Sequence, residues 1–144
     1  MNKPGEKGAA GQYAAVGTQT GVTEATPHRL IQMLLDGALD KIARAKGAMQ
    51  RKEIAEKGNN ISSACSIVNG LCDSLDMDAG GEMAANLANL YNYMIRRLME
   101  GHAANDPVAL DEVASLLREI KCGWDAIPSE TINGGEMVKS MVGT

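Results

Sequence analysis

Apolar residues recur at every third or fourth position through the middle of the chain, in four segments separated by short polar breaks. The first segment, "TPHRLIQMLLDGALDKIARA", places Leu30, Leu34 and Ile42 on one stripe. It opens with Thr26 and Pro27. Threonine followed by proline is typical of a helix start, because the N–H that proline lacks has no partner there. The pattern predicts a first helix whose first residue is Pro27.

The second segment has the spacing of a heptad seam. Its apolar positions lie alternately four and three residues apart: Ile61, Cys65, Val68, Cys72 and Leu75. Beside this seam, Ala64, Ile67 and Leu71 widen the apolar arc to about 160°, compared with the roughly 100° that a surface helix needs. We therefore expect surplus apolar surface on this helix, either covered by a terminal segment or used to bind a peptide.

Polar breaks frame the other two helices. In "DMDAGGE" a glycine pair ends one helix, and the acidic residues suit the start of the next. We expect the third helix to run from about Glu82 to Gly101, with its inward side chains at Met83, Leu87, Leu90, Tyr91, Met94 and Leu98. "NDP" then places Asp106 as a cap, and the fourth helix carries Leu110, Val113, Leu117, Ile120 and Trp124. The boundary between the first two helices, within Met49–Asn60, stays open because Gly58 fits a loop or a helix.

Four helices of about 20 residues with short connections predict an all-α fold, an antiparallel four-helix bundle. We assign the bundle to residues 26–127. In this interpretation residues 1–25, with their five glycines, form a flexible arm, and residues 128–144 form a flexible tail. We expect Tyr13 of the arm to fold back over the surplus apolar surface of the second helix when no partner is bound.

Composition narrows the function classes. The 144-residue chain has a formal net charge of −4 and a pI near 5.2, which gives no support to binding of nucleic acid or of an anionic membrane. No apolar run approaches the roughly 20 residues that span a bilayer, and the N-terminus lacks the apolar stretch of a signal peptide. We therefore expect a cytoplasmic protein with no membrane insertion and with reduced cysteines.

The sequence shows no pattern of catalytic or metal-ligating residues. His28 lies in the first turn of the first helix and His102 follows the glycine that ends the third. Neither is flanked at three or four positions by a second ligand of the right type, and the Glu-x-x-His pair of di-iron bundles is absent. We expect no catalytic residue, no metal and no cofactor, and we interpret both histidines as solvated. The alternative function is a histidine phosphotransfer bundle, or another signalling or adaptor bundle. A phosphotransfer relay would need an exposed histidine midway along a helix.

Two of the tyrosines, Tyr91 and Tyr93, lie two positions apart in "ANLANLYNYMIRRLMEG". Residues i and i+2 point about 200° apart on a helix, so only one of the two can face the core. On a helical wheel Tyr91 falls inside an apolar arc of about 140°, and Tyr93 falls outside it. The outward stripe consists of Asn86, Asn89, Tyr93 and Arg97, with Leu90 at its border. We expect this stripe to face a partner.

Three segments of the chain resemble the family of flagellar secretion chaperones called FliS. They are "TPHRLIQMLLDGALDKIARA", "SLDMDAGGEMAANLANLYNYMIRRL" and "NDPVALDEVASLLREIKCGW". Together with Tyr13, the resemblance covers about residues 13–127. The combination of "LDMDAGGE" with "LANLYNYMIRRL" is its most specific part. The chain departs from the family pattern at Leu35, where the family usually has a tyrosine.

The resemblance implies a flagellin-specific type III export chaperone. Such a protein binds the disordered C-terminal segment of flagellin, prevents premature polymerisation and delivers the subunit to the type III export gate. We place the partner-binding surface on the arm tyrosine, the wide arc of the second helix and the outward stripe of the third: Tyr13, Ala64, Ile67, Leu71, Asn86, Asn89, Leu90, Tyr93 and Arg97. The amides there could hydrogen-bond the backbone of a segment that arrives without structure.

Overall fold

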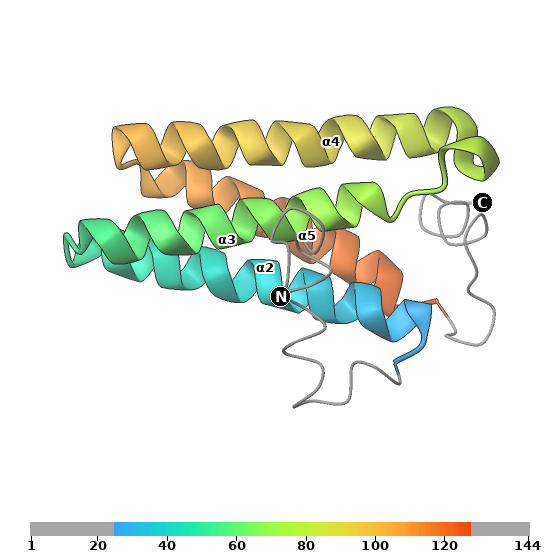
Figure 1. Cartoon of the computed structure of the whole chain (residues 1–144), viewed down its shortest axis with the longest axis horizontal. Coiled ribbons are helices and arrows are strands. Elements are labelled where there is room, and N and C mark those ends of the chain that lie inside the picture. The colour runs from blue at the N-terminus through green and yellow to red at the C-terminus, as the bar shows by residue number, and fades with distance from the viewer. Residues whose placement is uncertain (1–24, 128–144) are drawn as a thin grey trace, which may run out of the picture.

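The structure, a computed structural model, describes residues 25–127. These residues form four helices, α2 (Pro27–Gln50), α3 (Ile54–Asp73), α4 (Met77–Ala104) and α5 (Pro107–Asp125), and no strand. Each helix runs opposite to the one before it, and the four close a ring in which α3 packs on α2 and α4, and α5 packs on α4 and α2 (Figure 1). The predicted antiparallel four-helix bundle is confirmed. Tyr13 and the predicted tail lie outside the described residues.

Side chains cap three of the four helices, and two of these caps, Thr26 and Asp106, were predicted. The Oγ1 atom of Thr26 accepts a hydrogen bond from the backbone N–H of Arg29 at 3.1 Å, and an Asp106 carboxylate oxygen accepts one from Val108 at 3.0 Å. Both bonds satisfy N–H groups that a first helical turn otherwise leaves without a partner. The connection from α2 to α3 is short, since α2 ends at Gln50 and α3 begins at Ile54, and Gly58 lies inside α3.

The glycine pair bends α4 rather than ending α3. Helix α3 ends at Asp73, and Asp76 caps a single turn, Met77–Gly80, that precedes the long part of α4. Gly81 then has φ 55° and ψ −131°, a conformation outside the helical region that side chains with a Cβ rarely adopt. The predicted start near Glu82 therefore matches the uninterrupted part of α4, and the short turn before it was missed.

The wide apolar arc of α3 is buried, so the expected surplus surface is wrong. Ala64, Ile67 and Leu71 are 0%, 4% and 1% exposed, whereas Cys65 and Cys72 of the heptad seam are only half-buried. Helix α2 carries buried alanines at positions 38, 45 and 48. Small side chains allow two helices to approach closely, and interaxial distance depends on the side chains at the contact. Packing on α2 has therefore turned α3 toward the 64–67–71 flank.

Candidate functional site

A stripe of five side chains follows one face of α4, as predicted from the helical wheel. We call it the α4 stripe, and it consists of Asn86, Asn89, Leu90, Tyr93 and Arg97. The two amides are exposed, while the leucine, the tyrosine and the arginine are half-buried. The spacing of three and four residues places them on adjoining turns. The stripe is therefore accessible, and it joins amide, apolar, aromatic and cationic groups on one helix.

The N-terminal half of the α4 stripe borders an open hollow of about 350 Å³. Met83, Asn86, Leu87 and Leu90 line this α4 hollow. Met83 was predicted to face the core, but it is 43% exposed. The reason is the course of α5, which begins beside Gly101 of α4 and ends with Trp124 bonded to His28 at the start of α2. Its last turns therefore lie against α2, which leaves this half of α4 open on one side.

A carboxylate from α5 holds the C-terminal half of the α4 stripe. The Tyr93 hydroxyl donates a hydrogen bond to one Glu112 oxygen, and the Arg97 Nε–H donates to the other at 2.7 Å. Hydrogen bonds from Arg97 and then Tyr93 hold the pKa of Glu112 below its usual value, and the bond to Glu112 raises the pKa of Tyr93. Tyr93 therefore points away from the core of the bundle, but its hydroxyl is bonded to a side chain of α5.

Sequence reasoning missed Glu112 because no local spacing connects it with the stripe. It lies 19 positions after Tyr93 and on the next helix. The available signal was weak: an arginine on a polar stripe, facing an antiparallel neighbour that carries acidic residues. The shared Glu112 carboxylate fixes the side chains of Tyr93 and Arg97 in one orientation. Because these side chains are already ordered before a partner binds, binding costs less conformational entropy.

We expect Glu112→Gln to lower the free energy of unfolding near neutral pH and to have a smaller effect in acid. The folded-state pKa of Glu112 is lowered, so its contribution is complete above the unfolded value of about 4.3 and is lost as the pH falls through the folded value. Urea denaturation at about pH 7 and pH 3 measures the difference. Glu119→Gln is the matched control, because exposed Glu119 has no ion pair within residues 25–127. An equal loss in both variants would contradict the role of Glu112.

Comparison with known proteins decides the family. Residues 9–131 match the family model described as "Flagellar protein FliS". The chain belongs to the FliS family. The predicted resemblance is therefore confirmed, over nearly the same residues.

Several relatives support the same assignment. The "Flagellar secretion chaperone FliSB" of Pseudomonas aeruginosa is 51% identical over 116 residues, which cover 81% of this chain and 92% of the relative. The "Flagellar secretion chaperone FliS" of Vibrio cholerae is 37% identical over 127 residues, 88% of this chain and 93% of the relative. The protein of the same name from Salmonella typhimurium is 43% identical over 116 residues, 80% and 86% of the two chains. FliS is a family of chaperones, not of enzymes.

Neither histidine of this FliS-family chain is a solvated end group, so that interpretation is wrong. His28 is 6% exposed and stacks on Trp124, with ring centroids 5.3 Å apart and planes 13° from parallel. The His28 Nε2 atom lies 3.0 Å from the Trp124 carbonyl oxygen, and the Trp124 indole N–H donates to the His28 carbonyl oxygen at 2.9 Å. His102 is half-buried, and its Nδ1 atom is buried without a partner among residues 25–127. Neither side chain offers what a phosphotransfer relay would need.

The remaining features of this FliS-family chain concern metal binding, membrane spans, the cysteines and Leu35. Among residues 25–127, no group of three or more acidic, cysteine or histidine side chains could hold a metal ion. Within the same range no helix is both long and apolar enough to cross a membrane. Cys65, Cys72 and Cys122 are free thiols, and burial raises the pKa of Cys65. Leu35, where the family pattern has a tyrosine, is 0% exposed and packs in the core.

Proposed function

We propose that this protein is a cytoplasmic chaperone that binds the C-terminal segment of flagellin, prevents its premature polymerisation and delivers it to the type III export gate. The observation that carries the proposal is the match to the FliS family over residues 9–131, together with relatives named flagellar secretion chaperones. An accessible stripe of mixed chemistry beside an apolar hollow is consistent with a client that arrives as an unfolded segment.

The α4 stripe and the α4 hollow are the client-binding surface in this proposal. Exposed Met83 and half-buried Leu90 supply apolar contact, and methionine adapts its shape to different partners. Asn86 and Asn89 each carry donors and an acceptor, which suit a backbone that has not yet formed its own hydrogen bonds. Tyr93, held by Glu112, provides a rigid aromatic contact of the kind that often dominates binding energy.

The other predicted contacts take different roles in the proposal. Ala64, Ile67 and Leu71 are buried between helices, so a client cannot reach them in this bundle, and we assign them to packing. Tyr13 stays a proposed contact, but it lies outside the described residues. Because Ile67 and Leu71 are already covered, the surplus surface that motivated an arm folded over this helix is absent.

Co-purification with flagellin tests the proposal most directly. The full chain should retain full-length flagellin and should lose it when the last ~50 residues of flagellin are removed. We choose this length because a helical segment of ~50 residues could extend along several helices of this bundle. Binding that is indifferent to the truncation would contradict the assignment of the client segment. A parallel incubation with a phosphodonor tests the phosphotransfer alternative, since acid-labile phosphate on His28 or His102 would count against a chaperone.

We expect the complex with flagellin to tolerate salt. Ordering an unfolded segment costs conformational entropy, and burial of apolar area must offset this cost. Raising the salt concentration from ~0.05 M to ~0.5 M shortens the Debye length to a few ångströms, so it weakens charge pairs and leaves apolar contacts largely unaffected. Isothermal titration at both concentrations should show only a modest change in affinity. A loss of about a hundredfold or more would show that charged groups carry the binding.

A further inference from the structure

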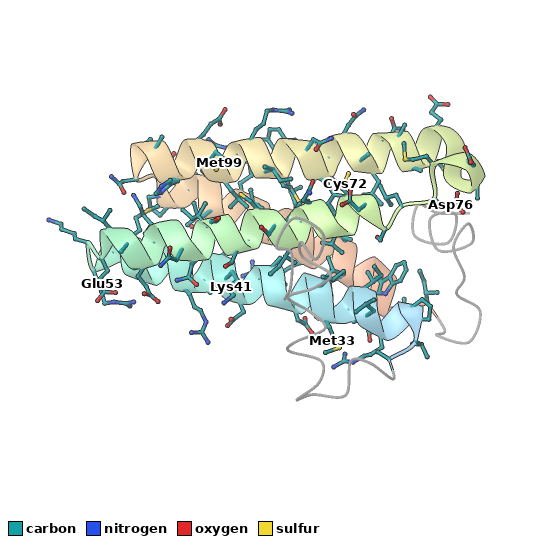
Figure 2. All side chains as sticks on the ribbon, in the orientation of Figure 1. Met33, Lys41, Glu53, Cys72, Asp76 and Met99 are labelled. Atoms are coloured by element: carbon teal, nitrogen blue, oxygen red, sulfur yellow. The ribbon has the colours of Figure 1, made fainter. Side chains whose placement is uncertain are left out.

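A second cavity lies at the end of the bundle where α2 turns into α3. It has a volume of about 350 Å³, and its lining includes Met49, Lys52, Ile54, Lys57 and Asn105. In Figure 2 this end is marked by Glu53, and Asp76, just before α4, lies at the opposite end. Along α4, Asn105 is 15 residues beyond Leu90 of the α4 hollow, which corresponds to about 22 Å. We call this site the turn cavity, and it is separate from the client-binding surface.

The apolar part of the turn cavity is unusually exposed. Ile54, the first residue of α3, is 77% exposed, more than any other large apolar side chain among residues 25–127. Met49 is half-buried beside it, and Ala48 is fully buried. A single exposed isoleucine would need no explanation, but here it forms the rim of a concave site with a methionine. The cavity can therefore accept an apolar side chain from a partner.

The polar part of the turn cavity carries two ammonium groups, those of Lys52 and Lys57, neither of which is paired with a carboxylate of the described residues. Lys57 is only 5% exposed, and its Nζ donates to the His102 carbonyl oxygen at 3.2 Å and to the Asn105 side-chain oxygen. An ammonium has three donors, so one remains. Within the described part of the chain, neither Lys57 nor Lys52 has an ion-pair partner.

The carboxylate that lines the cavity is already engaged. Glu53 forms an ion pair with Arg51 at 3.0 Å. Lys52 has φ 62°, in the left-handed region. This backbone conformation of the turn sets the direction in which the Lys52 side chain leaves the chain. Burial of an ammonium is costly unless it is paired with an anion. The turn cavity thus combines apolar walls with ammonium groups that have no anionic partner among the described residues.

We propose that the turn cavity is a second docking site, for a segment of a partner protein in which a carboxylate side chain is flanked by apolar residues. The carboxylate would bind the ammonium groups of Lys52 and Lys57, and a neighbouring apolar side chain would pack on Met49 and Ile54. Charge complementarity selects this occupant, because an apolar segment alone would leave both ammonium groups without an anion. The site stands apart from the α4 hollow, so a bound client and this partner can be held together.

Two matched tripeptides test the proposal on the ¹⁵N-labelled full chain by NMR titration. Ac-Leu-Glu-Leu-NH₂ should shift the amide signals of Ile54, Lys57 and Asn105. Ac-Leu-Gln-Leu-NH₂, which differs only in charge, should bind about tenfold more weakly, as expected for hydrogen bonds to a charged group. Equal binding of the two peptides, or shifts confined to other regions, would overturn the proposal.

Substitutions separate the two parts of the cavity. Ile54→Ser should weaken the glutamate peptide about fivefold, as expected when a contacting apolar side chain is removed. Lys52→Asn, which removes the charge and tolerates a positive φ, should weaken it about threefold, in the range of an exposed ion pair. Val108→Ser is the control, since Val108 is 64% exposed near the same end but does not line the cavity. An effect of Val108→Ser as large as that of Ile54→Ser would overturn the site assignment.

The test also identifies other occupants. Ile54→Ser should leave affinity for flagellin unchanged, which keeps this inference distinct from the proposed function. Cavity signals that move on dilution of the full chain without peptide would assign the site to a second copy of the chain. Cavity signals that move in Glu136→Gln without peptide would assign it to the chain's own C-terminal segment. Either result would overturn the proposed partner.

Discussion

Replacement of Tyr91 by alanine is expected to lower the free energy of unfolding by about 3–5 kcal/mol, the usual cost of removing a large buried ring. Tyr91 is 2% exposed and, with Met94 and Leu98 of the same helix, belongs to the hydrophobic core of the bundle. The loss would be a large share of the roughly 5–15 kcal/mol that stabilises a typical domain. Urea denaturation followed by circular dichroism measures it, and we expect a clear shift of the midpoint with little change of slope.

Tyr93→Ala is the matched comparison, because it removes the same ring from the same helix two positions later. Tyr93 is half-buried and contacts Glu112 at the surface, so the fold should remain nearly as stable as the wild type. If the α4 stripe binds the client, affinity for flagellin should fall by about 1–2 kcal/mol, a typical value for an interface tyrosine. Equal destabilisation by the two substitutions would contradict the inward and outward assignment.

Trp124→Ala should be comparably destructive, because Trp124 joins the last turn of α5 to the first turn of α2. The side chain is 1% exposed, stacks on His28 and donates to the His28 carbonyl oxygen. Removal of the ring should cost about 3–5 kcal/mol through the cavity that it leaves. Calorimetry is the suitable measurement, since the substitution also removes the chain's single tryptophan fluorophore.

Trp124→Phe separates stacking from hydrogen bonding at the same junction. Phenylalanine retains an aromatic ring against His28 but cannot donate a hydrogen bond. The carbonyl oxygen of His28 would lose its indole partner, with an expected cost of about 1–3 kcal/mol. A phenylalanine variant as unstable as the alanine variant would show that the hydrogen bond, not the packed ring, holds the two helices together.

The sequence by itself determined the helices and most of the core. Thr26 with Pro27, and Asp106 with Pro107, start helices where they were predicted, because a cap depends only on residues within one turn. Tyr91 was placed inward and Tyr93 outward from helical spacing alone, and burial confirms the first. The α4 stripe was predicted for the same reason, since all its members lie on one helix. FliS membership also followed from motifs that are contiguous in the chain.

The tertiary structure decided everything that depends on how one helix lies against another. Close packing on α2 selected which flank of α3 is buried, so Ala64, Ile67 and Leu71 became core instead of surface. The path of α5 from α4 to α2 left Met83 exposed and buried His28 against Trp124. Glu112 of α5 reached Tyr93 of α4 because these two helices pack against each other. Helical periodicity fixes directions around one axis, whereas the rotation and divergence of neighbouring axes arise from the summed packing of all the side chains between them.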